Sequence, residues 1–539
     1  MKQIIHSLHA IFFLCPAAVS KGSSLLAREV ASGLGSMILP KANHRLGFGS
    51  HLRSLLMVLS TLIVGCSPSK TSDEQATKKP NLLVIMTDEH NFRTLGCYRD
   101  ILPREQAYVW GDGLAVETPN IDFLAQEGVL FSKFYCVTPS CSPARGSFVS
   151  GLYPQHTGVQ QNDLPMYDHV ATFASVLKEN GYATGYAGKW HLDGEGKPQW
   201  GPERKFGFED NRYMFNRGHW KKMVDTPGGP EVAAKDSTGN YSYALDGADD
   251  KTFATDFLTD KTIEFIEKNK EAPFCYMVSY PDPHGPDTVR PPYDTMYTHM
   301  NFEPPATSQK PDDDVPSWAS KVEEEVDQSQ YFGMVKCIDD NVGRLVKTLE
   351  EHDLLENTII IFTSDHGDLR GEHYRRNKGV PLEASAKVPF IVYAKSMHHK
   401  GTKVSHVFNS VDFAPTLLSY MGLEKQESME GIDFSALLHD PSKQTDLEDF
   451  TVIRSSNKNN LWIAGATSRY KLVLSEQDPP WLLDLQENPG ETINYIEEPG
   501  KRKVVKDLAQ RLKTYALERK DPFLQNTEIE KEMLKLCED

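Results

Sequence analysis

The sequence predicts an α/β fold in which a large mixed, mostly parallel sheet is flanked by helices, followed by a smaller C-terminal α+β domain that carries a short antiparallel sheet. Continuous apolar runs of strand length occupy residues 81–86 and 274–279, and a third run ends at Phe362. Such runs are typical of strands that are covered on both faces in a parallel sheet. Between them, apolar residues recur at helical spacing, as in residues 331–351, which indicates helices that pack on this sheet.

Each of the three apolar runs is followed by a polar cluster. Asp88 and Glu89 follow the first run, His284 follows the second, and Asp365 and His366 follow the third. Ligands of open α/β sheets bind beyond the carboxyl ends of the strands. We therefore expect these clusters to converge on one edge of the sheet.

The length of the chain, 539 residues, allows one large core and a second, smaller domain. We predict an α/β domain over residues 80–425 and a smaller subdomain over residues 426–539. Residues 194–251 are rich in Gly, Pro, Asp and aromatic residues and predict a long excursion over the sheet, of the kind that shapes binding pockets. Near the C-terminus, residues 471–485 resemble a hairpin, and residues 502–519 predict a helix that packs on it.

Residues 1–66 predict a leader. Basic residues precede an apolar run at 55–64, which is too short to span a bilayer. The tetrapeptide IVGC at 63–66 resembles the lipobox of bacterial lipoproteins, and residues 67–79 form a polar tether. We therefore predict export and a lipid anchor at Cys66, in the outer membrane or the periplasm, with the cell surface as a further location. An ordinary cleaved signal peptide is the alternative.

Charge and cysteine usage narrow the class of protein. A formal net charge of −17 argues against nucleic acid or an anionic membrane surface as the main partner, because neither is attracted by a negative field. Any anionic substrate must then enter a locally positive pocket. The sequence indicates no disulfide framework, because no paired spacing exists among Cys97, Cys136, Cys275, Cys337 and Cys537.

The most specific signal is the motif CSPAR at residues 141–145, and a second motif, GYATGYAGKWH, lies at residues 181–191. Together they resemble the signatures of the type I, formylglycine-dependent sulfatase family of the alkaline phosphatase superfamily, and the similarity extends over residues 80–495. The resemblance implies that a maturation enzyme oxidises Cys141 to formylglycine, whose hydrated aldehyde is the nucleophile. Taken alone, Cys141 also fits a buried cysteine near a helix start.

The resemblance further implies roles for the other catalytic residues. Lys189 and Lys378 would bind the sulfate, and Arg145 would add positive charge beside the nucleophile. His191 would act as the base that regenerates the nucleophile, and His284 as the general acid that protonates the leaving alcohol. Histidine titrates near neutrality and suits this last role without much tuning.

The implied metal ligands are the polar residues at the strand ends together with the modified Cys141. Asp88 and Asp365 offer hard carboxylate oxygens, which favour calcium. His366 offers a nitrogen, which makes manganese the less favoured alternative. Glu89 stands where relatives carry a second aspartate, and its longer side chain either reaches the ion or turns away.

These implications predict hydrolysis of sulfate esters on a sulfated polysaccharide or its oligosaccharides. The alternatives are a phosphonate or phosphate monoester hydrolase of the same superfamily, and a catalytically inactive glycan-binding lipoprotein. The implied partners are the glycan, the maturation enzyme and a membrane reached through Cys66. Aromatic residues near or within the excursion would either stack on sugar rings or pack in the protein, namely Trp190, Trp200, Tyr213, Phe215 and Trp220.

Overall fold

The structure is a computed structural model that describes residues 78–538, apart from residues 309–314, 321–325, 457–460 and 526. The predicted leader and the lipid anchor at Cys66 lie outside the described residues. Within the described part, no helix combines the length and the apolar character needed to cross a membrane.

An eight-stranded sheet organises the larger part of the fold, in the order β11-β2-β10-β9-β1-β8-β4-β5. The strands from β9 to β5 run parallel, whereas β10 pairs antiparallel with both β9 and β2. The predicted mixed, mostly parallel sheet is therefore confirmed. The strands are β1 (Asn81–Asp88), β2 (Val129–Phe131), β4 (Ala183–Lys189), β5 (Asp210–Phe215), β8 (Phe274–Pro283), β9 (Thr358–Ser364), β10 (Phe390–Ala394) and β11 (Thr402–Val404).

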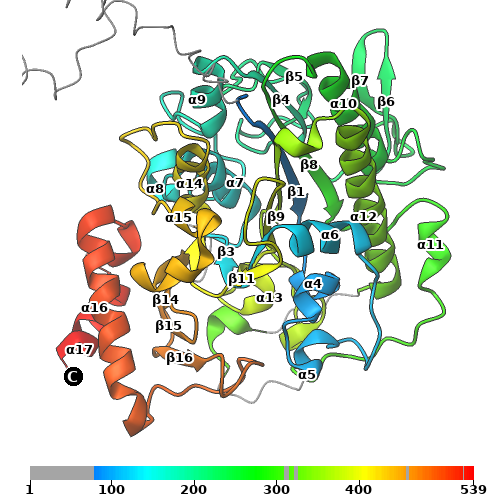
Figure 1. Ribbon diagram of the computed structural model, residues 1–539. Coiled ribbons are helices and arrows are strands. Elements are labelled where there is room, and N and C mark those ends of the chain that lie inside the picture. Colours follow the sequence, from blue (N-terminus) through cyan, green and yellow to red (C-terminus); the bar gives the residue numbers. More distant parts are fainter. Residues whose placement is uncertain (1–77, 309–314, 321–325, 457–460, 526, 539) are drawn as a thin grey trace, which may run out of the picture. The chain divides into compact units, whose positions relative to one another are not determined.

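Helices cover both faces of this sheet (Figure 1). Leu82 and Val84 of β1 join the core beneath α7, α9 and α14, whereas Leu83 and Ile85 join the core beneath α6, α10 and α12. Successive side chains of a strand point to opposite faces, so burial on both sides explains why the strand sequence is continuously apolar. The helices of the two layers are α6 (Pro119–Glu127), α10 (Ala254–Asn269), α12 (Gln328–Glu351), α7 (Cys141–Ser150), α9 (Phe173–Glu179) and α14 (Phe413–Tyr420).

Shorter elements connect these layers. The strands β3 (Phe134–Tyr135) and β12 (Phe408–Asn409) form a separate two-stranded sheet. The short helices are α4 (Gly96–Arg99), α5 (Arg104–Ala107), α8 (Pro154–Thr157), α11 (Tyr293–Met296), α13 (Glu383–Ala386) and α15 (Ser435–His439).

The excursion at residues 194–251 differs in part from the expectation. Instead of only lying over the sheet, it supplies β5, which pairs in parallel with β4 and becomes an edge strand. This pairing satisfies backbone groups that the edge of β4 would otherwise expose, and it buries Phe215. The strands β6 (Met223–Thr226) and β7 (Gly229–Val232) then form a hairpin.

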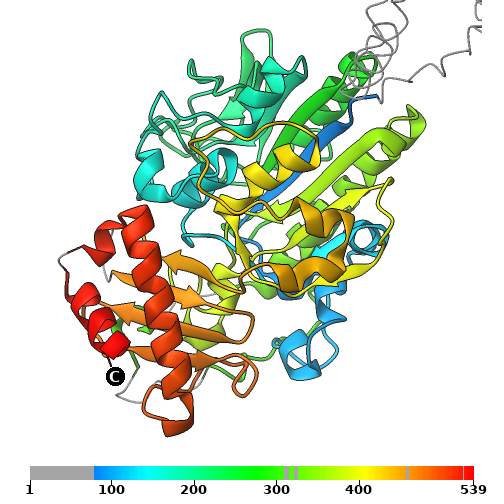
Figure 2. The same ribbon diagram turned by 60° about the vertical axis from the view of Figure 1, so that its left-hand side comes forward.

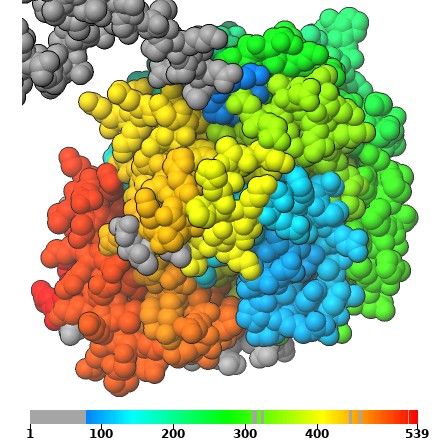
Figure 3. Space-filling model, in the orientation of Figure 1, coloured from blue at the N-terminus to red at the C-terminus, as the bar shows by residue number. Residues whose placement is uncertain are grey.

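The C-terminal part contains a four-stranded antiparallel sheet, β13 (Thr451–Arg454), β14 (Trp462–Ala466), β15 (Tyr470–Ser475) and β16 (Trp481–Asp484). One face packs under α16 (Arg502–Arg519) and α17 (Glu528–Glu538), and Figure 2 shows α16 lying across it. The other face packs on residues of the larger part, and Figure 3 shows the orange and red segments directly beside the yellow one. The short antiparallel sheet, its final hairpin and the helix at residues 502–519 are confirmed.

Asp412, at the start of α14, gives a prediction about pH. Its carboxylate is buried and accepts hydrogen bonds from the backbone N–H groups of Asn409 (2.9 Å) and Ile432 (2.8 Å). Burial raises the pKa of Asp412 from 3.8 to about 6. The folded state therefore binds the Asp412 proton more tightly than the unfolded state does. The stabilisation that protonated Asp412 provides is complete below the unfolded pKa of 3.8 and is lost as the pH rises to about 6. The expected loss is about 3 kcal/mol.

Urea unfolding of the wild type and of Asp412→Asn between pH 4 and pH 7 measures this loss. We expect the free energy of unfolding of the wild type to fall over this pH range and that of Asp412→Asn to stay level. The variant should therefore become more stable relative to the wild type as the pH rises. Asp433→Asn, which changes an exposed aspartate of the same region, should follow the wild type. Parallel curves for the wild type and Asp412→Asn would contradict the assignment.

Candidate active site

The carboxyl ends of three neighbouring strands meet at one edge of the sheet. Thr87 of β1 lies opposite Ser364 of β9, and Asp88 lies opposite Pro283 of β8. The polar residues that follow these strands therefore emerge side by side. The three clusters that the sequence places after separate strands are brought together, as expected.

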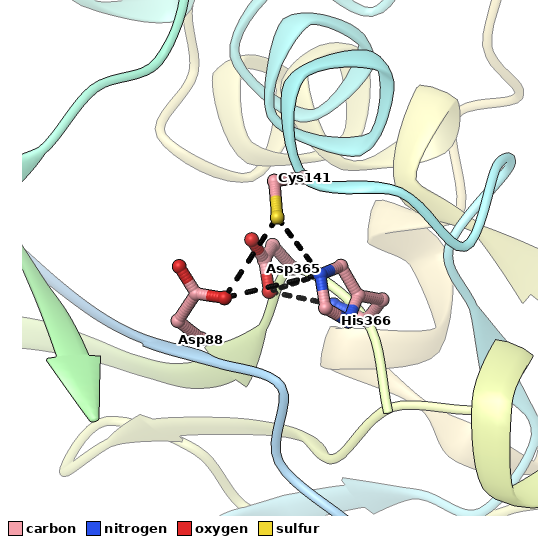
Figure 4. Close-up of side chains that lie close together, drawn as sticks. All are labelled: Asp88, Cys141, Asp365 and His366. Atoms are coloured by element: carbon pink, nitrogen blue, oxygen red, sulfur yellow. Dashed lines mark hydrogen bonds and ion pairs between the residues drawn. The ribbon is translucent and has the colours of Figure 1, made fainter. Parts of the chain in front are cut away.

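Four buried side chains at this edge point toward one another (Figure 4). One ligand atom from each of Asp88, Cys141, Asp365 and His366 lies within 4.8 Å of the others. His366 Nδ1 lies 3.0 Å from the carbonyl oxygen of Gly367, and since a carbonyl only accepts, Nδ1 carries a proton and Nε2 is the nitrogen that faces the cluster. Two carboxylates and an imidazole that gives up its Nε2 proton on ligation fit a divalent cation.

Glu89 is not one of these four. Its Oε2 lies 2.8 Å from His284 Nε2, and its Oε1 lies 3.2 Å from Lys378 Nζ. The backbone of Glu89 adopts φ 63°, a left-handed conformation that is costly for a residue with a side chain. This turn directs Glu89 away from Asp88 and toward the general-acid candidate.

Replacing Glu89 by glutamine separates its two expected roles. Because Glu89 contacts His284 and Lys378, we expect Glu89→Gln to lower kcat for an alkyl sulfate by about 10- to 100-fold while the bound metal per chain, measured by elemental analysis, stays unchanged. Asp365→Asn is the matched comparison and should lower the metal content. A loss of metal in Glu89→Gln would instead make Glu89 a ligand.

Cys141 is the first residue of α7 and is only 3% exposed. Asn162 Oδ1 accepts hydrogen bonds from Ser142 N (2.9 Å) and Ser140 Oγ (3.0 Å), and so caps the first turn. The Sγ atom lies 3.2 Å from His366 Nε2 and 3.6 Å from Lys189 Nζ.

The surroundings of Cys141 favour negative charge. Burial raises the pKa of the Cys141 thiol, but the positive charges of Lys189, Lys378 and His366 outweigh it and hold the pKa well below its usual range. His366 is itself affected: burial lowers its pKa, but Asp365 and Cys141 raise it to about 9. Position 141 therefore suits an anionic oxygen as well as it suits a thiolate.

Arg145 does not face the pocket. Its Nε donates to Asp365 Oδ2 (2.9 Å), its Nη2 to Asp88 Oδ2 (3.2 Å), and its Nη1 to the Lys189 carbonyl (2.7 Å) and Ser279 Oγ (2.6 Å). The side chain is 2% exposed. Arg145 thus holds the two carboxylates of the cluster in place, and the positive charge of the pocket itself comes from lysines.

Lys189 and Lys378 contact different residues of the site. Lys189 is fully buried, and its Nζ donates to Asp88 Oδ2 at 2.5 Å. Lys378 is 16% exposed and contacts Glu89, and this carboxylate together with Cys141 raises the Lys378 pKa above its usual range although burial lowers it. These two lysines give the locally positive pocket that the net charge requires.

His191 turns toward residue 141 from the end of β4. Its backbone adopts φ 61°, and its Nε2 lies 2.8 Å from Asp163 Oδ1. The buried Nδ1 has no hydrogen-bond partner among the described residues, and the His191 side chain helps to lower the pKa of Cys141. Asp163 also pairs with Arg217 (3.0 Å). This partly exposed ion pair holds the carboxylate that fixes the His191 ring.

His284 follows β8 and is 15% exposed. Its Nδ1 lies 2.9 Å from the carbonyl oxygen of Gly285 and therefore carries a proton. Its Nε2 faces both Glu89 Oε2 (2.8 Å) and Lys378 Nζ (2.9 Å). Protonated Nε2 can donate to Glu89, and neutral Nε2 can accept from Lys378, so each state of the imidazole has a partner.

The residue that the sequence did not single out is His219, in the excursion. Its Nε2 lies 2.8 Å from Lys189 Nζ, and its ring stacks on His284 with centroids 3.5 Å apart. Burial, His284 and Lys189 hold the pKa of His219 well below its usual range. No strand, helix period or motif marks this position in the sequence, so only the folded chain reveals it.

The aromatic residues proposed for sugar stacking mostly pack in the protein. Trp190, Phe215 and Trp220 are buried in the two main core clusters, and Trp200 and Tyr213 pack against them. For Tyr213 and Phe215 the reason is that β5, which carries them, pairs with the edge of the sheet. Most of the glycan contacts expected from aromatic stacking are thus unavailable at these positions.

Comparisons with known proteins agree with this geometry. A family model described as Sulfatase matches residues 80–423, and one described as N-sulphoglucosamine sulphohydrolase, C-terminal, matches residues 371–518. The chain is 29% identical over 484 residues to the ulvan-active sulfatase of Formosa agariphila, with 88% of each chain covered. It is 25% identical over 469 residues to the N-acetylglucosamine-6-O-sulfatase of Bacteroides thetaiotaomicron, covering 73% of this chain and 76% of that one.

A solved structure, the yidJ protein of Bacteroides fragilis, matches with a TM-score of 0.68 at 25% identity, covering 84% of this chain and 98% of that chain. The Sulfatase match spans more than half of this chain and contains every residue placed at the site above. Sulfatases generally use a metal and formylglycine, which fits the donor set around Cys141. The chain therefore belongs to the sulfatase family of the alkaline phosphatase superfamily and is a sulfuric ester hydrolase.

Proposed function

We propose that this sulfatase removes sulfate from a polysaccharide or its oligosaccharides, with formylglycine made from Cys141 as the nucleophile and calcium as the bound ion. The relatives named for ulvan and for N-acetylglucosamine-6-O-sulfate support a glycan substrate. The two carboxylates beside His366 support a divalent ion, with calcium favoured by the oxygen ligands and manganese by the nitrogen.

The observation that carries the proposal is the arrangement of charge around residue 141. Lys189 and Lys378 place two ammonium groups at the pocket, where they would bind the sulfate oxygens and offset the negative charge that develops during transfer. When bound, calcium and hydrated formylglycine supply a positively charged centre and a hydroxyl nucleophile. The Cys141 thiol occupies the place that these hydroxyl groups would take.

His284 and His191 have different roles in proton transfer. The His284 side chain is 15% exposed, whereas the four residues of the cluster are buried. Its Nε2 donates a proton to the leaving alcohol oxygen. His191 donates from Nε2 to Asp163, so its Nδ1 lone pair faces residue 141 and can take the proton that is lost when the nucleophile is regenerated. His191 thus keeps Nδ1 without a hydrogen-bond partner among the described residues, whereas His284 Nε2 is held by Glu89 and Lys378 until the leaving oxygen takes their place.

We further propose that the chain is exported and lipid-anchored at Cys66, in the outer membrane or periplasm, and that a maturation enzyme modifies Cys141 first. A surface or periplasmic location would bring the pocket to polymeric substrates that cannot enter the cytoplasm. Mass analysis of the mature N-terminal peptide from the native host tests the anchor: an unmodified N-terminus beyond residue 66 would refute it.

The proposed function is tested by expressing the chain with and without a formylglycine-generating enzyme. Mass analysis of the peptide that carries residue 141 should show the aldehyde only in the first case, and only that preparation should release sulfate from members of a panel of sulfated glycans. Equal sulfate release by both preparations would refute the formylglycine nucleophile. Release from aryl sulfate but from no glycan would refute the glycan substrate.

The phosphonate or phosphate monoester hydrolase alternative is decided by the same preparation. We expect the matured protein to hydrolyse an aryl sulfate with a higher kcat/KM than the matched aryl phosphate. The reverse order would favour the alternative.

A further inference from the structure

The excursion delivers one functional group into the sulfate pocket. His219 sits between Lys189 and His284, the two residues expected to bind sulfate and to protonate the leaving group. Its Nε2 lies 2.8 Å from Lys189 Nζ and 4.0 Å from Asp88 Oδ2. Since an ammonium group only donates, Nε2 accepts, and the proton of a neutral His219 sits on Nδ1.

The contact with Lys189 restricts where that ammonium group can point. One of its three N–H bonds is taken by Asp88 Oδ2 at 2.5 Å and a second by His219. Cys141 Sγ, at 3.6 Å, lies in the remaining direction. With two donors held by fixed acceptors, the third is directed at the place where a group on residue 141 and its sulfate would lie.

The contact with His284 restricts the plane of that ring. The two imidazoles stack with centroids 3.5 Å apart and an interplanar angle of 9°. Tyr243 also contacts His219, with ring centroids 5.8 Å apart. A neutral imidazole stacked on an imidazolium is attractive, whereas two imidazolium rings would repel. His219 therefore supports His284 when His284 carries the proton to be transferred.

The segment that carries His219 is tied to the end of β8, directly before His284. Lys221 is fully buried, and its Nζ donates to Asp282 Oδ1 (2.6 Å) and to the carbonyl oxygen of His284 itself (3.0 Å). On the other side, Gly218 adopts φ +116°, and an added Cβ would lie 2.3 Å from the Trp220 ring. The backbone on both sides of His219 is therefore fixed, and this restricts the position of its ring in the pocket.

We propose that His219 is a positioning residue of the sulfatase reaction, which directs the Lys189 ammonium at the sulfate and holds the His284 ring in the plane from which it protonates the leaving oxygen. This inference rests on the roles proposed above for Lys189 and His284. It gives the excursion a part in the chemistry as well as in the shape of the pocket.

Three variants separate the two contacts. His219→Phe keeps a flat ring against His284 but removes the acceptor for Lys189, His219→Gln keeps an acceptor but removes the stack, and His219→Ala removes both. Each is matured, checked for formylglycine by mass, and measured on two esters with the same sulfate: an aryl sulfate with a good leaving group, which needs little acid catalysis, and an alkyl or sugar sulfate, which needs much.

We expect His219→Phe to raise KM for both esters by about 10-fold, because sulfate binding is weakened in each. His219→Gln should lower kcat for the alkyl ester by about 10- to 100-fold while changing the aryl ester less than about 3-fold. His219→Ala should show both effects. In a His284→Ala background, His219→Gln should cause no further loss on the alkyl ester, because the two residues act as one unit.

The control is His156→Ala, which removes a histidine that is 40% exposed and pairs with Glu430, and which contacts none of the residues placed at the site; it should match the wild type on both esters. The inference is overturned if His219→Phe and His219→Gln match the wild type, or if every variant loses both esters equally in proportion to a fall in Tm. A matured wild type that hydrolyses neither ester, or a His284→Ala variant that loses no preference between them, would instead refute the proposed function.

Discussion

Replacing Cys141 by alanine is expected to lower kcat for any sulfate ester by on the order of 10⁴-fold or more. The side chain lies at the start of α7, within reach of Lys189 and His366, and no other described nucleophilic side chain belongs to the four-residue cluster. Without it, the lysines can still bind sulfate but no group is present to attack it. The measurement is sulfate release by the matured variant, with binding of inorganic sulfate followed in parallel.

Cys537→Ala is the matched control, because it removes a free cysteine from the half-buried C-terminal helix. It should leave sulfate release unchanged. Hydrolysis retained by Cys141→Ala would end the assignment of the nucleophile. Retained glycan binding by a wild type that shows no hydrolysis in matured form would favour the glycan-binding lipoprotein that the sequence left open.

Replacing Arg145 by alanine is expected to give the largest loss of stability. Arg145 is the guanidinium that bridges Asp88 and Asp365, and these carboxylates are completely buried. Burial lowers the pKa of Arg145, but Asp365 and Asp88 raise it above its usual range, so the group stays charged. Removing one partner of a buried pair leaves uncompensated charge and costs about 3–5 kcal/mol.

The measurement is urea unfolding of wild type and Arg145→Ala in the presence of a chelator, so that no bound cation replaces the lost charge. Arg212→Ala is the matched control, since Arg212 is 55% exposed and pairs with Asp225 at the surface, and such a pair contributes only about 0–1 kcal/mol. A loss for Arg145→Ala as small as that of the control would show that the two carboxylates do not depend on Arg145.

The central strands and the polar residues at their ends could be predicted from the sequence. The runs that end near Asp88, His284 and Asp365 are continuously apolar because both faces of a central strand are covered, and this pattern is typical of a parallel sheet. The CSPAR and GKWH motifs indicated Cys141 and Lys189 through their resemblance to the sulfatase signatures, since a motif of fixed spacing is a local feature. The helix at 502–519 followed from its period.

Other features could not follow from local sequence. Nothing in residues 88–90 shows that the backbone turns left-handed at Glu89 and sends its carboxylate to His284 and Lys378. The motif that contains Arg145 does not show that its side chain donates inward to two carboxylates, a carbonyl and a hydroxyl. Direction in space depends on which strands are neighbours, and this is a non-local property.

The sequence by itself therefore determined which residue types stand at the ends of the central strands and beside the nucleophile, because those are properties of short segments with a strong period or motif. Only the tertiary structure decided which of them share a cluster, and that His219 enters it from the excursion. The physical reason is that such contacts join residues far apart in the chain, and they form only when β5, β4, β8, β1 and β9 take their order in one sheet.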